Sequence, residues 1–381
     1  MLICGIDGGN NTVITAVEGK DPIVIPTIIA EYSDLDIGLE LKEKSLLESL
    51  DVEIELNYNN QKTKRNLGRY YVGNRVKDAN VSADMRNIGD TKKGDEKLLI
   101  VMLSSLAAAA VVDQGKNSGI VKQDLKIVTG LPFLQYKKDR DTYKQEFIGQ
   151  HKVIIRGKNT IEVELNIMDV TVDVEGAGAL NKLIFNEDDY IYPDDELVER
   201  TILGVEVGEF TTEIIALKFK ENQDGNIIPE YNIPLCTGID KGIANAKQKV
   251  IDYLREQCGT KKDRYDIDLA VRRGKKRGII ILKNRQEFDI MPLYTQQLTK
   301  LAADITGTLK DKIENSNDSI GDILHTLLYG GGPCVLDYHF GNAMREKIEA
   351  SIGCKSDIAE NPHFANALGY LEKAKYIYGE E

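Results

Sequence analysis

Two short stretches of this sequence carry glycines, an acid and a threonine in the same register. The chain opens with MLICGIDGGNNTVITA, and residues 201–216 read TILGVEVGEFTTEIIA. The corresponding residues are Gly5, Asp7, Gly9 and Thr12 in the first stretch and Gly204, Glu206, Gly208 and Thr211 in the second. A pattern that occurs once in each half of the chain predicts a chemical task shared by the two halves.

Glycine turns of this kind can bind phosphate. Without a Cβ atom the backbone approaches an anion closely, and successive N–H groups form a nest for phosphate oxygens. A carboxylate fits beside phosphates when it orients a hydrated Mg²⁺ ion, so Asp7 and Glu206 are candidate metal residues that act through water. Because Gly-Gly-Asn-Asn also forms ordinary hairpin turns, one copy leaves both interpretations open. The second copy favours two hairpins that grip one triphosphate.

The flanking segments predict the elements that position these turns. Both stretches read strand, glycine turn, strand, and a third β-rich run follows the first of them at 22–32. Residues 95–114 predict a buried helix that begins with an Asp. Residues 151–166 predict a hairpin, and 169–174 predict a separate strand.

The second half repeats this order of elements. A long amphipathic helix is predicted over 292–315, and a strand then leads into the triple glycine at 330–332. At 381 residues the chain is too long for one ordinary core. Strand-rich starts followed by alternating strands and helices predict two α/β domains with mixed sheets.

The composition excludes several classes of protein. No apolar run approaches the roughly 20 residues of a membrane span, and the amino terminus lacks the features of a secretory signal. Five scattered cysteines without a C-x-x-C pair argue against a disulfide framework and suit a reducing cytoplasm. A formal net charge of −12 disfavours direct nucleic-acid binding, so a role on DNA would need a partner protein.

Motifs of other nucleotide-binding or hydrolytic proteins are missing from the sequence. The four histidines lack H-x-x-x-H spacing, which makes a zinc enzyme an unsuitable interpretation. The sequence contains neither the G-x-x-x-x-G-K-[ST] motif of Walker-type proteins nor the G-x-S-x-G turn of α/β-hydrolases.

In their order and spacing, the motifs of this chain resemble the actin-like ATPase superfamily, which includes sugar kinases and heat-shock chaperone ATPases. The chain is most similar to ParM-type plasmid segregation proteins, which are bacterial actin-like filament proteins. The similarity extends over essentially the whole chain. Beyond the two turns it rests on RYYVGNRVKDAN (69–80), VTGLPFLQY (128–136), DVTVDVEGAGAL (169–180), CTGIDKGIANA (236–246), LLYGGGPCVL (327–336) and NPHFANALGYL (361–371).

The resemblance implies an α/β fold of duplicated actin-like (ribonuclease H-like) domains, with mixed β-sheets flanked by helices and the nucleotide in the interdomain cleft. The first domain is expected at 1–185 plus the C-terminal helix 363–381, with a small insert at about 34–80. The second is expected at 186–362, with a small insert at about 247–290.

The resemblance also implies roles for individual residues. The catalytic set is Asp7, Glu175 and Glu206, in which Glu175 orients the water that attacks the γ-phosphate and the other two hold Mg²⁺ through water. A carboxylate favoured by a helix dipole is the alternative interpretation of Glu175. The expected nucleotide-binding residues are Gly8, Gly9, Asn10, Asn11, Thr12, Gly208, Glu209, Phe210, Thr211, Thr212, Gly238, Lys241, Gly331, Gly332 and Pro333.

The second turn departs from the pattern of the superfamily. Glu206 stands where Asp is usual, and Glu209 and Phe210 occupy positions where a glycine is frequent. A second acid in this turn would repel phosphate unless its side chain points away or meets a cation. The choice between ATP and GTP and the rate of hydrolysis stay open for this reason.

The resemblance therefore predicts a nucleoside triphosphatase that polymerises into dynamic head-to-tail filaments with ATP or GTP and Mg²⁺. The filament would segregate plasmid DNA in the cytoplasm through a DNA-binding adaptor protein, without contact to a membrane. The alternatives are a small-molecule kinase of the same superfamily, a chaperone-type ATPase and a nucleotide-binding scaffold with little turnover. The basic run RRGKKRG at 272–278 suits a solvated loop, a contact between protomers or a contact with DNA, and the acidic chain favours the protomer contact over the DNA contact.

Overall fold

The computed structural model describes residues 1–33, 45–48, 50–59, 63–79, 83–86, 90–157, 159–185, 194–272, 274, 276–316 and 320–379. Residues 34–44 of the first expected insert and residues 186–193 at the expected domain boundary lie outside this set. So do positions 273 and 275 of the basic run.

The chain divides into two units. The first comprises Met1–Tyr190 and Phe364–Glu381, and the second comprises Ile191–His363. The first unit therefore contains both the amino-terminal half and the carboxyl-terminal segment of the chain. Each unit is described by itself below.

The described strands of the first unit form one mixed sheet in the order β3-β2-β1-β8-β10-β9-β5-β6-β4-β7. Two strands of the expected first insert, β5 and β6, extend this sheet beyond β9. The bounds are β1 Leu2–Gly8, β2 Thr12–Val17, β3 Ile23–Pro26, β4 Ile28–Glu31, β5 Asp51–Leu56, β6 Arg65–Val72, β7 Asp84–Met85, β8 Gly119–Leu131, β9 Gly149–Arg156 and β10 Ile161–Val174.

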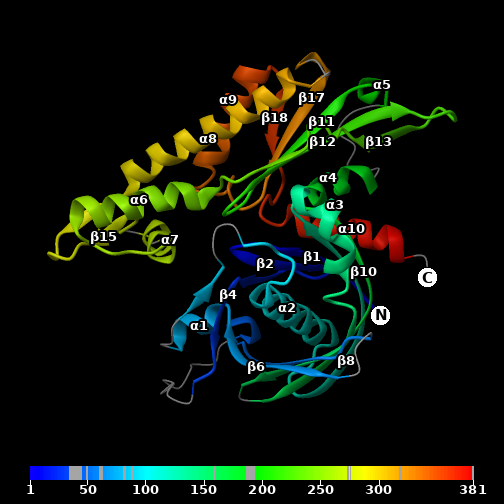
Figure 1. Cartoon of the computed structure of the whole chain (residues 1–381), viewed down its shortest axis with the longest axis vertical. Helices are drawn as coiled ribbons and strands as arrows, with labels where there is room; N and C mark the ends of the chain where they lie inside the picture. The colour runs from blue at the N-terminus through cyan, green and yellow to red at the C-terminus, as the bar shows by residue number, and fades with distance from the viewer. Residues whose placement is uncertain are drawn as a thin grey trace. The chain divides into compact units, whose positions relative to one another are not determined.

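Helices cover both faces of this sheet. The sheet curves around α2, whose residues from Leu98 to Val111 are buried among its strands (Figure 1). Asp95 accepts a hydrogen bond from the Leu98 N–H, so the helix begins with the acidic cap that the sequence predicts. Helices α4 and α10 pack together, and α10 also packs on β1 and β8. The bounds are α1 Asn74–Asp78, α2 Glu96–Gln114, α3 Phe133–Lys144, α4 Ala177–Phe185 and α10 Ala365–Tyr378.

The second unit has its own mixed sheet in the order β13-β12-β11-β17-β18, with β14 paired to β12. Its helix α8 confirms the long helix predicted from the sequence, and α7 with the hairpin β15–β16 extends the unit beside α6 (Figure 1). The bounds are α5 Asp194–Leu197, β11 Thr201–Val207, β12 Thr212–Glu221, β13 Ile227–Tyr231, β14 Thr237–Ile239, α6 Ile243–Cys258, α7 Arg264–Arg272, β15 Ile279–Ile281, β16 Glu287–Asp289, α8 Met291–Glu314, β17 Ile323–Tyr329, α9 His339–Ile352 and β18 Lys355–Ile358.

The two sheets contain the same five-stranded arrangement. In each unit the first strand pairs antiparallel with the second and parallel with a later strand, as β1 does with β2 and β8, and as β11 does with β12 and β17. The first hairpin closes at the pair Gly8 and Val13, and the second closes at Val207 and Thr212. The repeated sequence pattern thus lies on hairpins of equal length, which we call loop 1 (residues 9–12) and loop 2 (residues 208–211).

Two strand predictions differ from the structure. The run at 22–32 is split into β3 and β4, which pair with different strands, because the chain turns at Thr27. The strands predicted at 161–166 and 169–174 are one strand, β10, interrupted by a bulge at Met168. A bulge adds one residue and breaks the alternation of buried and exposed side chains, so the pattern reads as two strands.

A close contact between two helix backbones joins the end of the chain to the rest of the first unit. A Cβ atom at Gly369 of α10 would lie 1.6 Å from the carbonyl oxygen of Gly178 in α4. On its other side α10 approaches β1 so closely that a Cβ at Gly5 would lie 2.2 Å from the Ala367 carbonyl oxygen. The glycines in GAGAL, NALGY and CGIDGG therefore allow α10 to pack between α4 and the sheet.

This contact predicts a large effect for one methyl group. Replacing Gly369 by Ala forces α4 and α10 apart, and we expect the free energy of unfolding to fall by about 3 kcal/mol or more. Gly307, exposed in α8 with open space around its Cα, is the matched control. Its replacement by Ala should raise stability by up to ~1 kcal/mol through helix propensity. Equal stabilities of the two variants in urea unfolding would contradict the packing argument.

Candidate functional site

The first unit brings two of the predicted catalytic acids together around a buried lysine. Asp7 is the next-to-last residue of β1. Glu175 directly follows β10, and its N–H donates to the Leu131 carbonyl at 2.6 Å. Lys92 Nζ lies 2.8 Å from Glu175 Oε1, and the two side chains are only 2% and 8% exposed. Both Lys92 and Glu175 lie close enough to Asp7 to shift the pKa of its carboxyl.

This cluster has less positive charge than its acids require. Burial raises the pKa of the Asp7 carboxyl from 3.8 to about 6, the Lys92 ammonium opposes the rise, and the Glu175 carboxylate adds to it. One ammonium therefore serves two carboxylates. Glu175 Oε2 is buried and has no hydrogen-bond partner among the described residues. A cation or a hydrogen-bond donor at this place would stabilise the charged forms.

Loop 1 is held from two sides. The Thr27 hydroxyl donates to the Gly9 carbonyl at 2.8 Å, and Arg86, which is only 1% exposed, donates to the side-chain carbonyl of Asn10. Arg86 also pairs with Asp95, the cap of α2. Gly9 itself permits no side chain, because a Cβ there would lie 2.5 Å from the Thr12 carbonyl oxygen. Loop 1 is thus a fixed turn.

In the second unit the backbone of loop 2 is oriented by the start of α6. The Gly208 carbonyl accepts from the Ile243 N–H at 3.1 Å, and the Glu209 carbonyl accepts from the Ala244 N–H at 2.7 Å. In a trans peptide the N–H points opposite to the C=O. The N–H groups of Glu209 and Phe210 therefore face away from α6, as two successive donors suited to an anion.

The two unusual side chains of loop 2, Glu209 and Phe210, both have partners within the second unit. Both carboxylate oxygens of Glu209 accept from Lys247 Nζ, at 3.0 and 2.9 Å. The Phe210 ring is 5% exposed, and the Arg264 guanidinium carbon lies 4.7 Å from its centroid. If these residues contact a nucleotide, as the sequence predicts, the backbone amides are the groups available for it.

The glycine cluster of the second unit lies directly against the end of β11. The Gly332 N–H donates to the Val207 carbonyl at 2.8 Å, and a Cβ at Gly332 would lie 2.6 Å from the Val207 Cβ. A Cβ at Gly330 would lie 3.1 Å from Glu206 Cγ. The structure thus brings the glycine cluster with the predicted nucleotide-binding residues Gly331 and Gly332 close to Glu206, the acid before loop 2.

Gly238 lies in β14, which pairs with the beginning of β12, the strand that follows loop 2. It pairs with Glu213, and a Cβ at Gly238 would lie 3.1 Å from a carboxylate oxygen of Glu213. Glu213 is 3% exposed and lies directly opposite Glu206 in the hairpin, so the two carboxylates share one face of the sheet.

The other predicted side chains have partners outside these loops. Lys241 Nζ lies 2.8 Å from Asp304 of α8, and its carbonyl accepts from the Thr212 hydroxyl. In the basic run Arg277 pairs with Asp337. Lys276 pairs with Glu287 at 3.0 Å. Two cations of the run, Lys276 and Arg277, therefore have acidic partners within the second unit.

The sequence pattern missed two residues of these clusters. Glu213 could have been found from the hairpin itself, since a four-residue loop after Val207 makes Glu206 and Glu213 cross-strand partners. Lys92 has no such signal, because it lies in the connection before α2, and only the fold brings it to Glu175.

No group of three or more His, Cys, Asp or Glu side chains among the described residues is arranged to hold a metal ion by itself. Mg²⁺ usually keeps several waters and binds one or two carboxylates together with substrate phosphates. The deficit of positive charge around Asp7 suits such a hydrated cation.

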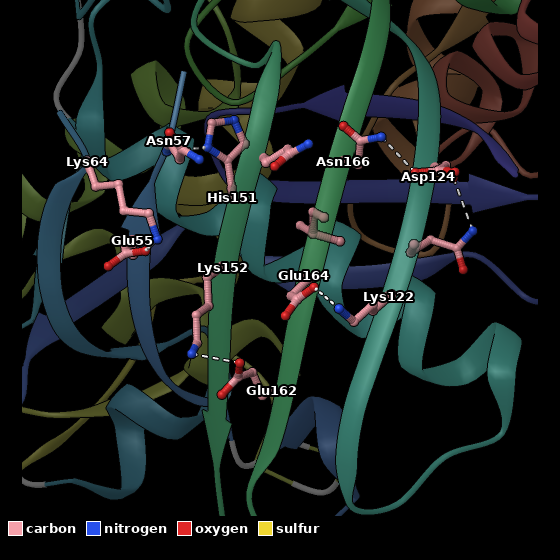
Figure 2. A pocket seen from close by; sticks show the side chains of 13 residues that line it. Glu55, Asn57, Lys64, Lys122, Asp124, His151, Lys152, Glu162, Glu164 and Asn166 are labelled. Atoms are coloured by element: carbon pink, nitrogen blue, oxygen red, sulfur yellow. Dashed lines mark hydrogen bonds and ion pairs between the residues drawn. The ribbon is translucent and has the colours of Figure 1, made fainter. Parts of the chain in front are cut away.

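A separate cavity of about 500 Å³ lies over strands of the first unit's sheet and contains none of the predicted site residues (Figure 2). Its lysines are paired with neighbouring glutamates: Lys64–Glu55 at 2.6 Å, Lys122–Glu164 at 2.8 Å and Lys152–Glu162 at 2.7 Å. Such pairs neutralise each other on a largely exposed sheet face. We assign no ligand to this cavity.

His151 in the wall of this cavity is a buried structural residue. Its Nε2–H donates to the Phe147 carbonyl at 2.8 Å, and its Nδ1 accepts from the Asn57 N–H at 3.2 Å. The imidazole is neutral in this arrangement, and burial lowers the pKa of His151 below 6.5. The ring thereby links β9 to the chain that follows β5.

Comparison with known sequences identifies two successive domains. Residues 5–178 match the family described as "Actin like proteins N terminal domain". Residues 204–342 match the family described as "Archaeal actin homologue MreB-like, C-terminal". The matches begin at Gly5 and Gly204, the first glycines of the repeated pattern. No curated protein sequence matches this chain.

Solved structures with the same fold extend over nearly the whole chain. A 15-stranded ParM filament from Clostridium botulinum is 20% identical, covers 98% of this chain and 99% of its own, and gives a TM-score of 0.72. Bacillus thuringiensis ParM with AMPPNP is 19% identical, with 99% of both chains covered and a TM-score of 0.63. An archaeal actin homologue is 15% identical, with 99% and 100% covered and a TM-score of 0.66.

These likenesses confirm the predicted actin-like fold with mixed sheets flanked by helices. Within the described part of the chain, none of the helices combines the length and the apolar character that crossing a membrane requires.

The buried pair Lys92–Glu175 predicts an effect on stability that depends on charge. Replacing Lys92 by Met leaves Glu175 buried beside Asp7 without a counter-charge, and we expect the free energy of unfolding to fall by about 3–5 kcal/mol. The double variant K92M/E175Q should regain more than half of this loss. The exposed pair Lys122–Glu164 gives the control, since K122M should change stability by less than about 1 kcal/mol. Equal urea midpoints for K92M and K122M would refute the argument.

His151 predicts a pH-dependent term in stability. Because the pKa of His151 is lowered in the folded state, the unfolded chain binds more protons as the pH falls below 6.5. The stabilisation is therefore present above this pH and is lost as the pH falls toward the folded pKa. The difference in unfolding free energy between wild type and H151Q should shrink between pH 7 and 5. Exposed His339 is the control, and a pH-independent H151Q difference would contradict the assignment.

Proposed function

Since this chain joins the N-terminal domain of the actin-like proteins to a MreB-like C-terminal domain, we propose that it binds ATP or GTP with Mg²⁺, hydrolyses it and polymerises into filaments. The observation that carries the proposal is the cluster of Asp7, Glu175 and Lys92 at the base of loop 1. One ammonium faces two carboxylates in this cluster, and one buried carboxylate oxygen has no donor among the residues that the structure describes.

In the first unit Glu175 is suited to orient a water molecule. Lys92 Nζ holds Oε1 of Glu175 at 2.8 Å, while Oε2 can accept a hydrogen bond from water. Hydrolysis of a γ-phosphate depends mainly on positioning and charge stabilisation, so an acceptor at a fixed place is sufficient. The buried pair with Lys92 and the Oε2 atom without a donor among the described residues support this role over that of a carboxylate that only favours a helix start.

In the second unit the backbone supplies the contacts. The outward N–H groups of Glu209 and Phe210 would bind phosphate oxygens, and Gly331–Pro333 would pack against the purine. Gly332 approaches Val207 so closely that only a bare backbone fits between this loop and β11. Glu213 faces Gly238 and is a candidate acceptor for ribose hydroxyls.

Mg²⁺ would be held through water by Asp7 and Glu206 and would neutralise charge on the phosphates. Asp7 fits this role because its carboxyl is buried beside the Glu175 carboxylate, and burial raises its pKa to about 6 although Lys92 opposes the rise. Glu206 is 7% exposed and stands at the corresponding place of the second hairpin.

The similarity to ParM structures supports the proposal that this chain forms filaments. A ParM of the same fold forms a 15-stranded filament, and head-to-tail contacts between copies generate open polymers when the rotation does not close a ring. We extend this to plasmid segregation in the cytoplasm through a DNA-binding adaptor, because a formal net charge of −12 disfavours direct contact with DNA.

The alternative of a nucleotide-binding scaffold with little turnover has less support. It rests on the two unusual acids of the second turn, Glu206 and Glu209, and Lys247 neutralises Glu209. Glu206 still supports this alternative, since its carboxylate lies one methylene further from the backbone than that of the usual Asp.

Glu175 predicts a separation of assembly from hydrolysis. With Mg²⁺ and ATP or GTP the wild type should pellet in a nucleotide-dependent manner and release phosphate. E175Q should release phosphate at least ~100-fold more slowly, because the oriented water is lost, and should still pellet with nucleotide. Sedimentation and a phosphate-release assay without any added acceptor substrate measure both.

The control is E164Q, which removes an exposed acid on the sheet face of the same unit. It should match the wild type in both assays. A wild type that stays in the supernatant with either nucleotide would rule out the filament, and normal phosphate release by E175Q would rule out the role of Glu175.

A further inference from the structure

A buried lysine in the second unit lies at the centre of a charge cluster that includes loop 2. Lys247 of α6 is 2% exposed, and its Nζ lies 2.9 Å from a carboxylate oxygen of Glu209 and 2.8 Å from one of Asp268. Glu209 belongs to loop 2 and Asp268 to α7. One ammonium therefore ties loop 2 to two helices.

Further contacts hold loop 2 in the same orientation. The Gly208 and Glu209 carbonyls accept from the first N–H groups of α6, and a Cβ at Gly242 would lie 2.5 Å from the Glu209 carbonyl oxygen. Phe210 is buried under the Arg264 guanidinium of α7. Main chain and side chains of loop 2 thus point toward α6 and α7, and the amides of residues 209 and 210 point away from them.

We propose that Lys247 is the positioning residue of loop 2, which holds the Glu209 carboxylate against α6 and thereby keeps two amides free for phosphate. This inference rests on the proposed nucleotide binding. Lys247 touches no phosphate in this role, because its ammonium already serves Glu209 and Asp268.

The physical reason is the sign of the charge on Glu209. A carboxylate next to a phosphate-binding amide repels the phosphate, unless it is turned away and neutralised. Glu209 is held by both of its oxygens and its side chain is only 11% exposed, which fixes its direction. An acid that would weaken binding in a free loop becomes the anchor of that loop.

Two variants separate positioning from direct contact. In K247M the Glu209 carboxylate is released, and we expect the Kd for a Mg²⁺-bound nucleotide analogue to rise at least ~10-fold. In K247M/E209Q the repelling charge is gone, and the Kd should return to within about 3-fold of the wild type. K220M, which breaks an exposed pair with Glu230 in the same unit, is the control and should bind like the wild type.

Two binding results overturn the proposal. One is a K247M variant that binds as tightly as the wild type. The other is a K247M/E209Q variant that binds as weakly as K247M, since the loss would then come from the lysine itself and not from the released carboxylate.

Amide hydrogen exchange without nucleotide separates this inference from the proposed function. In K247M the Ile243 and Ala244 amides, which donate to loop 2, should exchange at least ~10-fold faster than in the wild type. K247M also lowers global stability, because it leaves two acids without their buried counter-charge, and buried Leu309 in α8 reports this loss. The increase in exchange at Ile243 and Ala244 should therefore exceed the increase at Leu309. A wild type that binds neither ATP nor GTP would refute the proposed function, whereas an increase at Ile243 and Ala244 no larger than that at Leu309 would refute the positioning role of Lys247.

Discussion

The packing of α10 against both α4 and β1 is the constraint on which the first unit depends. Three glycines meet backbone atoms of the neighbouring element at distances that exclude any side chain: Gly5, Gly178 and Gly369. The same contact holds the start of α4, directly after the turn at residues 175–176, because the Ala179 N–H donates to the side-chain oxygen of Asn366. Glu175 lies in that turn, and Asp7 lies on β1. Helix α10 therefore packs against the strand that carries Asp7 and against the helix that follows Glu175.

Both units keep an acid near a glycine loop by means of a buried lysine. Lys92 serves Glu175 in the first unit, and Lys247 serves Glu209 in the second. The two pairs differ in the groups that remain available to a ligand. Around Lys92 two carboxylates share one cation, so the cluster is suited to receive a further positive charge. Around Lys247 the Glu209 carboxylate points toward α6 and α7, and the N–H groups of residues 209 and 210 point away from these helices.

Much of the fold could be predicted from the sequence because its signals are local. The hairpins, the helix with its cap at Asp95 and the long helix α8 follow from periodicity, turn residues and capping, which act within a few residues of the chain. The errors arose where a non-local partner decides. Thr27 splits one β run because it must reach the Gly9 carbonyl, and the bulge at Met168 hides the continuity of β10.

The sequence by itself determined the duplicated pattern, the positions of Asp7 and Glu206 on equivalent strands and the actin-like order of motifs. These are properties of spacing, and spacing is written along the chain. Only the tertiary structure decided which charges meet. Lys92 reaches Glu175, and Lys247 reaches Glu209, across separations that no local pattern records. A buried acid and its counter-ion need only lie close together in space, and their distance along the chain carries no information about that.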